Sequence, residues 1–175
     1  DDRIRKITFT GSKEVGEHIC RTAGLKRVTM ELGSNSPLIV MPDADIEKVV
    51  KATIASGFSN AGQVCISAQR ILTNKSIYSD FISALTENVK KMSIGNQLDP
   101  TVTMGPMIRS QDATRVNDWI KEATDNGART TTGGEYQGAL HEPTVVVDVS
   151  PDMTISCEEL FGPAVAVTPF TDIEQ

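Results

Sequence analysis

The sequence has 175 residues, of which 39% are hydrophobic and 23% charged, and its formal net charge is -6. This composition is typical of a globular chain with one domain, or one domain and part of another, and argues against disorder. Negative charge without a lysine and arginine cluster argues against nucleic acid as a partner, and no apolar run approaches the roughly 18 to 20 residues that cross a membrane. Three cysteines and two histidines, with no CxxC pair, predict no metal site and reduced thiols in the cytoplasm.

The chain predicts strands that alternate with helices. In chain order we expect a strand at 4–9, a helix from about 13 to 21, strands at 27–32 and 37–41, a helix at 46–58, a strand at 70–73, helices at about 81–92 and 110–125, and strands at 144–149 and 164–168. Alternation and β-branched residues indicate the strands, and apolar residues three or four positions apart indicate the helices. This order predicts an α/β fold with a mainly parallel sheet and flanking helices.

Cys65 is the first candidate for chemistry. It follows a helix and a glycine-containing break at Gly62, and its neighbours are small or polar, so we expect its thiol to be exposed in a cleft. A thiolate is a good nucleophile when its pKa is lowered or when a base assists it. The alternative is that Cys65 is a small buried apolar residue, as most free cysteines are.

Glu31 is the second candidate. A strand in which Val28 and Met30 alternate with polar Thr29 ends at this carboxylate, just before Gly33. Ligand sites in open α/β sheets lie at the carboxyl ends of strands, which favours a functional role. The other interpretation is a solvated loop charge, the commoner situation for an isolated glutamate.

Two further stretches have both a functional and an ordinary interpretation. The turn Thr10-Gly11-Ser12 leads into a helix, whose first N–H groups and dipole suit a phosphate, unless Ser12 is simply an N-cap. Residues 157–163 place adjacent carboxylates beside Phe161 and a Gly-Pro turn. That combination suits a sugar hydroxyl and a ring, or else a solvated acidic loop over a core phenylalanine.

Four stretches together resemble the aldehyde dehydrogenase superfamily, in its order and essentially from end to end. They are Phe9-Thr10-Gly11-Ser12, Glu31-Leu32-Gly33, Gly62-Gln63-Val64-Cys65 and Glu158-Glu159-Leu160-Phe161-Gly162-Pro163. The spacing between Glu31 and Cys65 is also the one familiar from that family. The resemblance implies an enzyme that oxidises an aldehyde to a carboxylic acid with NAD or NADP.

The resemblance also implies a role for each matched residue. Cys65 would attack the aldehyde to give a thiohemiacetal, and loss of hydride to NAD(P)+ would leave a thioester; the Cys65 backbone N–H would form half of an oxyanion hole. Glu31 would activate the water that hydrolyses the thioester. The implied cofactor residues are Ser12 at the pyrophosphate, Gly16 for close helix packing, Leu32 by the nicotinamide, Glu159 on the nicotinamide ribose, and Phe161 near that ring.

The resemblance has consequences for the extent of the chain. It implies that residues 1–31 end a Rossmann-like NAD(P)-binding domain and that residues 32–175 are a catalytic domain incomplete at its C-terminus. The sequence opens on Asp1 without an initiator Met or a signal peptide, which agrees with an internal fragment. We therefore expect little or no turnover from this chain alone, and a homodimer or homotetramer as the parent enzyme.

Some positions depart from the family or have no role in it. Gly33-Ser34-Asn35 stands where many members continue with Gly and Lys, a change that affects local loop contacts rather than the reaction. Cys20 and Cys157 match no catalytic position, and we interpret both as structural or incidental.

Other classes of function stay open from the residues alone. A cysteine hydrolase or acyl-transfer enzyme would use Cys65 with His18 or His141 as its base, although neither histidine has a recognisable catalytic context. A non-enzymatic relative or an interaction module is disfavoured because Cys65 and Glu31 are both retained. Among dehydrogenases, the CoA-acylating branch typically lacks the glutamate base, so Glu31 favours hydrolysis to the acid.

Overall fold

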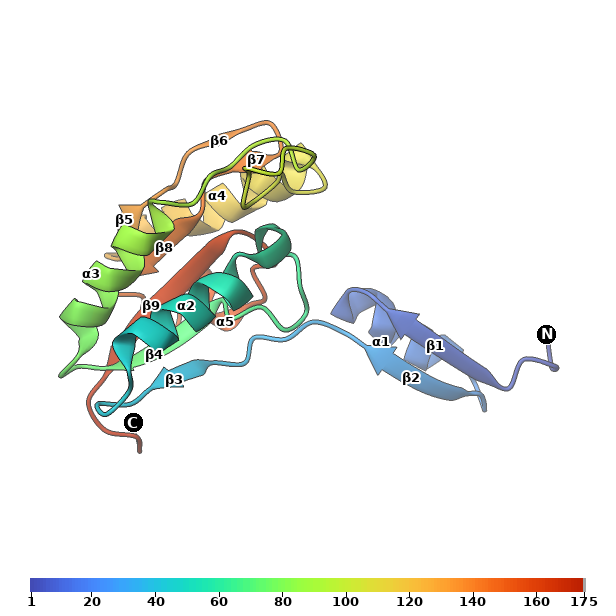
Figure 1. Cartoon of the computed structure of the whole chain (residues 1–175). Coiled ribbons are helices and arrows are strands. Elements are labelled where there is room, and N and C mark those ends of the chain that lie inside the picture. Colours follow the sequence, from blue (N-terminus) through green and yellow to red (C-terminus); the bar gives the residue numbers. More distant parts are fainter. Residues whose placement is uncertain (175) are drawn as a thin grey trace. The chain divides into compact units, whose positions relative to one another are not determined.

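The computed structural model describes residues 1–174, which divide into two compact units. Unit 1 comprises Asp1–Ser34, and unit 2 begins at Asn35. The division falls a few residues beyond the domain boundary that the resemblance implied, after residue 31. In Figure 1 unit 1 is the dark blue end of the chain.

Unit 1 is a β-α-β segment made of β1 (Lys6–Thr10), α1 (Lys13–Thr22) and β2 (Arg27–Glu31). Its two strands are parallel, with Lys6 opposite Arg27. Ser12 is the N-cap of α1, and its Oγ accepts a hydrogen bond from the Val15 N–H at 3.5 Å. The predicted strand, turn and helix are confirmed, and the Ser12 cap explains where the helix begins.

Unit 2 contains a five-stranded sheet in the order β3-β4-β9-β8-β5, in which every neighbouring pair is parallel except β8 with β5. A separate antiparallel hairpin is formed by β6 and β7. The predicted α/β fold with a mainly parallel sheet is therefore confirmed. The elements of unit 2 are β3 (Leu38–Val40), α2 (Ile46–Gly57), the 3-10 helix η1 (Ser59–Gly62), β4 (Arg70–Asn74), α3 (Tyr78–Val89), α4 (Ser110–Asp125), β5 (Arg129–Thr132), β6 (Tyr136–Gln137), β7 (Leu140–His141), β8 (Thr144–Val147), α5 (Thr154–Cys157) and β9 (Ala164–Phe170).

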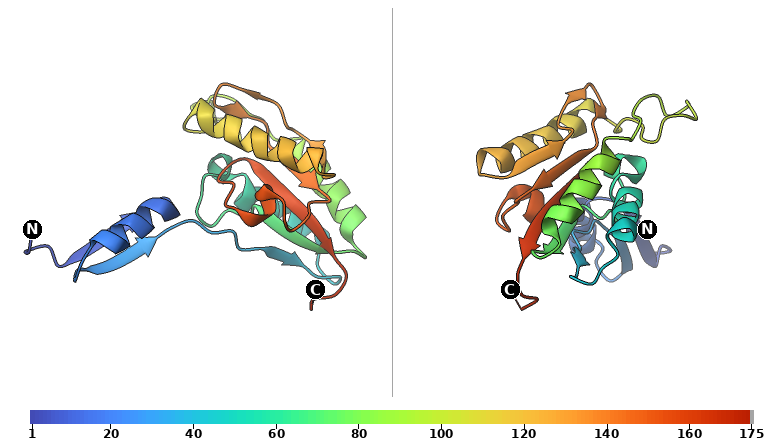
Figure 2. Two further views of the ribbon diagram at one scale, coloured as in Figure 1. Left: turned by 180° about the vertical axis from the view of Figure 1, so that it is seen from behind. Right: turned by 60° about the vertical axis from the view of Figure 1, so that its left-hand side comes forward.

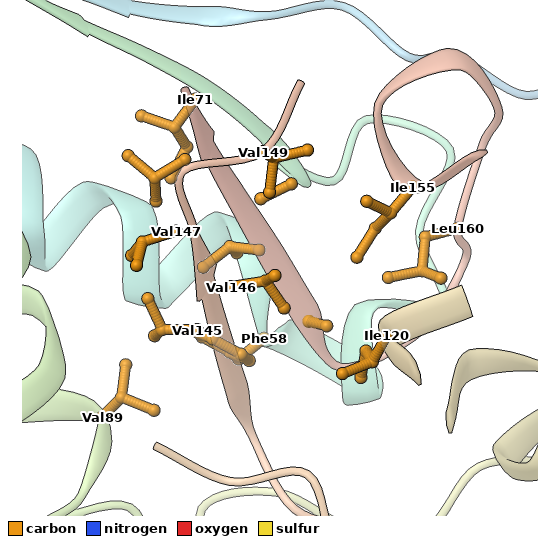
Figure 3. Packing of buried hydrophobic residues seen from close by; sticks show 14 of the residues in the cluster. Phe58, Ile71, Val89, Ile120, Val145, Val146, Val147, Val149, Ile155 and Leu160 are labelled. Atoms are coloured by element: carbon orange, nitrogen blue, oxygen red, sulfur yellow. The ribbon is translucent and has the colours of Figure 1, made fainter. Parts of the chain in front are cut away.

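Helices cover both faces of this sheet. Figures 1 and 2 show α2 and α3 side by side on one face, with α4 and α5 on the other. Strands covered on both faces are nearly continuous apolar runs, and β8 follows that rule, because Val145, Val146 and Val147 are all fully buried. Figure 3 shows these valines with Val89 to one side of β8 and Ile120 to the other.

The helices of unit 2 follow their predicted apolar faces. Asp45 caps α2, its side chain accepting a hydrogen bond from the Lys48 N–H at 3.2 Å. In α3 the side chains of Phe81, Leu85 and Val89, four positions apart, are buried. The helix predicted at 110–125 has those same bounds in the structure.

The region between α4 and β9 holds more structure than the sequence indicated. The predicted strands at 144–149 and 164–168 appear as β8 and β9, but the hairpin β6-β7 and the short helix α5 were not predicted. Two-residue strands carry too little alternation to stand out from turns. Among residues 1–174, no helix has the length and apolar character that crossing a membrane requires.

Candidate active site

In unit 1, two of the matched stretches meet at the carboxyl ends of the strands. Thr10, the last residue of β1, lies opposite Glu31, the last residue of β2. The Gly11 N–H donates a hydrogen bond of 3.1 Å to the Glu31 carbonyl oxygen. The exposed Glu31 side chain and the Ser12 turn thus emerge from the same end of one parallel pair.

Gly16 and Leu32, two of the predicted cofactor residues, lie against each other. Gly16 is the buried residue of α1, and a Cβ atom built on it would lie 2.6 Å from Leu32 Cδ2 and 2.9 Å from Leu32 Cδ1. A Cβ atom at this position would force the Leu32 side chain to move, so glycine lets the helix lie this close to Leu32. The close packing that the resemblance implied at Gly16 is observed; a role in cofactor binding stays a prediction.

In unit 2, Cys65 lies exposed on a turn between η1 and β4. Three consecutive residues before it, Asn60, Ala61 and Gly62, have left-handed φ angles of 50°, 54° and 71°. Two of these residues carry a Cβ atom, and such conformations cost about 1 to 3 kcal/mol each unless the surroundings enforce them. Backbone strain of this kind concentrates at functional sites, so it supports a functional role for the Cys65 thiol that follows.

Hydrogen bonds of Gln63 hold the strained backbone in place. Its side-chain Nε2 donates to the Asn60 carbonyl oxygen at 2.9 Å, and its Oε1 accepts from the Ile108 N–H at 3.0 Å. On the far side of the thiol, the Ser67 N–H donates to the Val64 carbonyl oxygen at 2.9 Å and closes the turn around Cys65. The thiol is therefore presented by a backbone that is fixed on both sides.

The loop before β9 carries the second pair of matched residues in unit 2. Phe161 has a left-handed φ of 46° and is 37% exposed as a residue, whereas its neighbour Leu160 is buried. Glu159 is half-buried and has polar partners of its own. The exposed residue Phe161, next in sequence but one to the half-buried Glu159, does not pack in the core and can contact a ligand.

Two glycines bring the Cys65 turn and this loop together. A Cβ atom on Gly62 would overlap the carbonyl oxygen of Gly162, and a Cβ atom on Gly162 would overlap the Val116 side chain of α4. The Gly62 contact shows that the two backbones approach each other directly, and the Gly162 contact shows that the same loop packs closely on α4. The structure thus joins the stretch ending at Cys65 with the stretch from Glu158 to Pro163, as a shared site requires.

The candidates in unit 2 precede their strands, unlike those in unit 1. Cys65 comes before β4, and Glu159 and Phe161 come before β9, so all three lie at the amino ends of parallel strands. The rule that ligands bind at the carboxyl ends of strands favoured Glu31, but it does not identify these three residues of unit 2. Their positions are set by tight backbone contacts among loops instead.

Sequence reasoning missed several residues that hold these loops. Gln69 is 2% exposed, and its Oε1 accepts hydrogen bonds from the Leu160 N–H at 2.9 Å and the Phe161 N–H at 3.2 Å. Arg115 of α4 donates to the Leu160 carbonyl oxygen at 2.7 Å. The available signal was slight: a polar residue directly before the apolar strand β4, and an arginine directly before Val116 on the buried face of α4.

The Arg115 guanidinium also contacts an aromatic ring and lies in the field of two carboxylates. It lies 5.2 Å from the centre of the Trp119 ring, close enough for a cation–π contact. Burial lowers the pKa of Arg115, and the charges of Asp112 and Glu159 oppose that effect. The influence of Glu159 shows that this predicted ribose ligand lies near a positive charge.

Neither histidine supports the cysteine hydrolase alternative. His141 is buried, its Nδ1 lies 2.8 Å from the Glu142 carbonyl oxygen, and its ring stacks on Tyr136 with the centres 5.9 Å apart. Loss of solvent around the ring lowers the pKa of His141. His18 is exposed on α1 in unit 1.

The other thiols have no comparable setting. Cys20, Cys65 and Cys157 are all free, and the Cys157 thiol donates to the Pro151 carbonyl oxygen at 3.0 Å. Across the described part of the chain, no group of three or more His, Cys, Asp or Glu side chains is arranged to hold a metal ion.

The comparisons with known proteins identify the family of the chain. The profile described as Aldehyde dehydrogenase family matches residues 1–175. The chain is 45% identical to 3-sulfolactaldehyde dehydrogenase of Priestia aryabhattai, covering 98% of this chain and 36% of that protein. It is 40% identical to the NADP(+) succinate-semialdehyde dehydrogenase GabD of Escherichia coli K12, covering 97% and 36%.

A solved structure extends the likeness to the fold. Betaine aldehyde dehydrogenase of Staphylococcus aureus, in complex with NAD+, superposes with a TM-score of 0.91 at 35% identity, covering 96% of this chain and 35% of that one. The chain thus spans about 36% of the length of the relatives that it matches. Since the family profile matches from the first residue to the last, the chain belongs to the aldehyde dehydrogenase family.

Proposed function

We propose that the protein carrying this chain oxidises an aldehyde to a carboxylic acid with NAD+ or NADP+, and that Cys65 is its nucleophile. The observation that carries the proposal is the exposed Cys65 thiol on a strained, tightly held turn, in a chain that belongs to the aldehyde dehydrogenase family throughout. Relatives named for three different aldehydes support the general reaction rather than one substrate.

Cys65 performs the first chemical step and ends the reaction unchanged. Its thiolate attacks the carbonyl carbon and forms a thiohemiacetal, while its backbone N–H stabilises the charge that develops on the oxygen. Loss of the hydrogen on that carbon, as hydride, converts the adduct to a thioester. The nicotinamide supplies the hydride acceptor when it is bound. Water then cleaves the thioester, releasing the acid and restoring the thiolate.

Glu31 acts in the last of these steps. As a carboxylate it takes a proton from water, so that hydroxide character develops as the oxygen attacks the thioester carbon. Its exposure at the carboxyl end of β2 leaves it accessible to water. Hydrolysis, rather than transfer of the acyl group to CoA, follows from the presence of this base.

The residues present fit a dinucleotide. Ser12 begins a ten-residue helix, whose first N–H groups suit the pyrophosphate, and Gly16 lets that helix pack against Leu32. Glu159 suits the nicotinamide ribose, and the exposed Phe161 ring suits the nicotinamide. In this proposal residues 1–31 belong to the nucleotide-binding domain and residues 32–175 to the catalytic domain.

The remaining expectations concern partners and location. We expect a homodimer or homotetramer, a cytoplasmic location that agrees with three unpaired thiols, and no nucleic acid or membrane partner. Low turnover of this chain by itself also stays a prediction, so activity is best measured on the complete protein in which the chain occurs.

The test combines substrates with two substitutions. The complete protein is assayed for reduction of NAD+ and NADP+ with 3-sulfolactaldehyde, succinate semialdehyde and betaine aldehyde. We expect Cys65→Ser to lower kcat by about 1,000-fold or more. In Glu31→Gln we expect one rapid turnover per subunit and then a stall, with the acyl group retained on Cys65 and detected by mass spectrometry.

Controls separate the nucleophile from the other thiols. Cys20→Ser and Cys157→Ser should keep activity, because neither thiol lies in a matched catalytic stretch. Full activity in Cys65→Ser would rule the mechanism out. Release of an acyl-CoA with wild-type rates in Glu31→Gln would instead place the enzyme in the CoA-acylating branch.

A further inference from the structure

Gln69 is a buried polar residue at the junction of three loops. Its Nε2 donates to Asn35 Oδ1 at 2.9 Å and to the Glu158 carbonyl oxygen at 3.3 Å, while its Oε1 accepts from the Leu160 and Phe161 N–H groups at 2.9 and 3.2 Å. A primary amide offers two donors and an accepting oxygen with two lone pairs. One side chain therefore satisfies backbone groups on both sides of Glu159.

The location of these partners follows from the sheet. Asn35 precedes β3, Gln69 directly precedes β4, and the loop from Glu158 to Phe161 precedes β9. Because β3, β4 and β9 are adjacent and parallel, their amino ends lie in a row with β4 in the middle. From this position the Gln69 side chain reaches the segments before both neighbouring strands.

The backbone of Gln69 links strand β9 to the Cys65 turn. Its N–H donates to the Ser67 carbonyl oxygen at 2.9 Å, and its carbonyl oxygen accepts from the Ala166 N–H of β9 at 2.8 Å. The Ser67 N–H in turn closes the turn that presents Cys65. Four positions after the nucleophile, Gln69 is therefore tied by its backbone to the thiol and by its side chain to the loop of Glu159.

Asn35 and Arg115 strengthen the connection. Asn35 Nδ2 donates to the Ser156 carbonyl oxygen at 2.8 Å, so the residue that binds Gln69 also holds α5, just before the loop. Arg115 holds the Leu160 carbonyl oxygen from the other side. With Gln69 removed, two buried or half-buried N–H groups and the Asn35 amide oxygen would lose a partner, which costs more than the bonds contribute.

We propose that Gln69 is a positioning residue for hydride transfer: it fixes the Glu158–Phe161 loop relative to the Cys65 turn. The inference rests on the proposed function, in which Glu159 and Phe161 hold the nicotinamide end of the cofactor. Hydride moves only between carbon atoms held within a narrow range of distance and angle. A side chain that joins the loop of the acceptor to the turn of the thiol controls that distance without touching either reactant.

The experiment compares Gln69→Leu, which keeps the size and removes the polar atoms, with Gln137→Leu on the exposed strand β6 as the matched control. Both are made in the complete protein. We expect Gln69→Leu to raise the KM for NAD(P)+ and to slow the first turnover, each by about tenfold, the change that 1.4 kcal/mol produces. In the absence of nucleotide, the rate at which iodoacetamide alkylates Cys65 in Gln69→Leu should stay within about twofold of the wild-type rate. The reason is that the hydrogen bonds of the Cys65 turn itself are retained.

Further readouts keep the two proposals apart. Unchanged nucleotide KM and first-turnover rate in a folded Gln69→Leu protein would overturn the positioning role. If the wild type reduces no nucleotide, the proposed function fails. Hydrogen exchange at the Leu160 and Phe161 amides then tests whether Gln69 fixes the loop. Faster exchange in Gln69→Leu than in wild type supports that claim, and equal exchange overturns it. If Gln69→Leu does not fold, Asn35→Ala is used, with a smaller rise in KM expected and no rise overturning the proposal.

Discussion

The two units of the chain differ in what holds them together. All the buried hydrophobic residues of the described chain belong to unit 2, from Val40 to Val167. In unit 1 the apolar side chains of Val15, Leu25 and Val28 are exposed, and Gly16 is the buried residue of its helix. Unit 1 therefore has regular secondary structure from a helix cap and strand pairing, whereas unit 2 adds a core that excludes water. Local hydrogen bonds alone contribute little net stability, so the two units should respond very differently to the same perturbation.

The same contrast holds for the candidate site. In unit 1, Ser12 and Glu31 lie at the carboxyl ends of strands, where the general rule for α/β proteins looks for ligands, and both are exposed. The residues of unit 2 precede strands and are fixed by glycine contacts and a buried amide. Chemistry that needs a thiol at a fixed position is thus expected from the unit that has a core to fix it.

Hydrogen exchange should give the largest difference between the units. Amides of β8 and β9 exchange only when unit 2 unfolds, while amides of β1 and β2 exchange through local opening. With a stability of about 5 kcal/mol or more for a cored domain, protection should differ by roughly 1,000-fold or more. Deuterium uptake followed by mass spectrometry measures this, and equal protection in both units would break the comparison.

Removal of an apolar side chain should give the next largest difference between the units, in the free energy of unfolding. Phe81→Ala empties a fully buried site in α3 and should lower the free energy of unfolding by about 3 to 5 kcal/mol. Val28→Ala, at an exposed position of β2, should change it by less than about 0.5 kcal/mol. Urea unfolding followed by circular dichroism compares the two variants, and similar losses would show that unit 1 has a core of its own.

A third comparison uses two glycines with left-handed backbone. Gly62→Ala meets both an unfavourable φ and the Gly162 carbonyl oxygen, so we expect a loss of about 3 kcal/mol or more in unit 2. Gly24→Ala has the same kind of φ, at 62°, but no atom within 4 Å, so only the conformational cost of about 1 to 2 kcal/mol applies. Thermal unfolding should show a large shift for the first variant and none in unit 2 for the second. A mild effect of Gly62→Ala would mean that the Cys65 turn and the loop before β9 are free to separate.

The smallest expected effect is the pH dependence that His141 gives to unit 2. Burial lowers its pKa in the folded protein below the ordinary value of 6.5, so the unfolded chain binds the proton more readily. The stability is therefore full above that ordinary value and is lost as the pH falls through it toward the folded pKa. Urea midpoints at descending pH should fall less steeply in His141→Gln than in wild type, with His18→Gln of unit 1 as the control. A steep fall that persists in His141→Gln would assign the dependence to other groups.

Much of this fold is predictable from the sequence because its signals are local. The apolar face of α3 lies within that helix, and the capping carboxylate of Asp45 directly precedes α2. Both signals can therefore be recognised in a short stretch of sequence. The strand Thr144–Val147 is recognisable from its unbroken β-branched run. The strand order is not local: β9 pairs with β4 and β8, and several helices and strands separate β4 from β9 in the sequence.

The candidate site divides in the same way. Cys65 stands out beside a glycine-containing break, and the Ser12 cap is confirmed by its hydrogen bond. Gln69 and Arg115 give no such signal, since their partners in the loop before β9 are 91 and 45 residues away in sequence. The position of Gln69 directly before an apolar strand is only a weak signal, because a glutamine that faces water can occupy the same place in a sequence.

The central place of β9 has a consequence for synthesis on the ribosome. β4 is complete at Asn74, but its neighbour on that side begins only at Ala164, about 90 residues later. At the usual elongation rate of about 5 to 20 residues per second, this edge of β4 stays unpaired in the nascent chain for roughly 5 to 20 seconds. An apolar strand edge open for that time is a place where another nascent chain can pair, so growth at lower temperature or with more chaperone should improve the yield of folded protein.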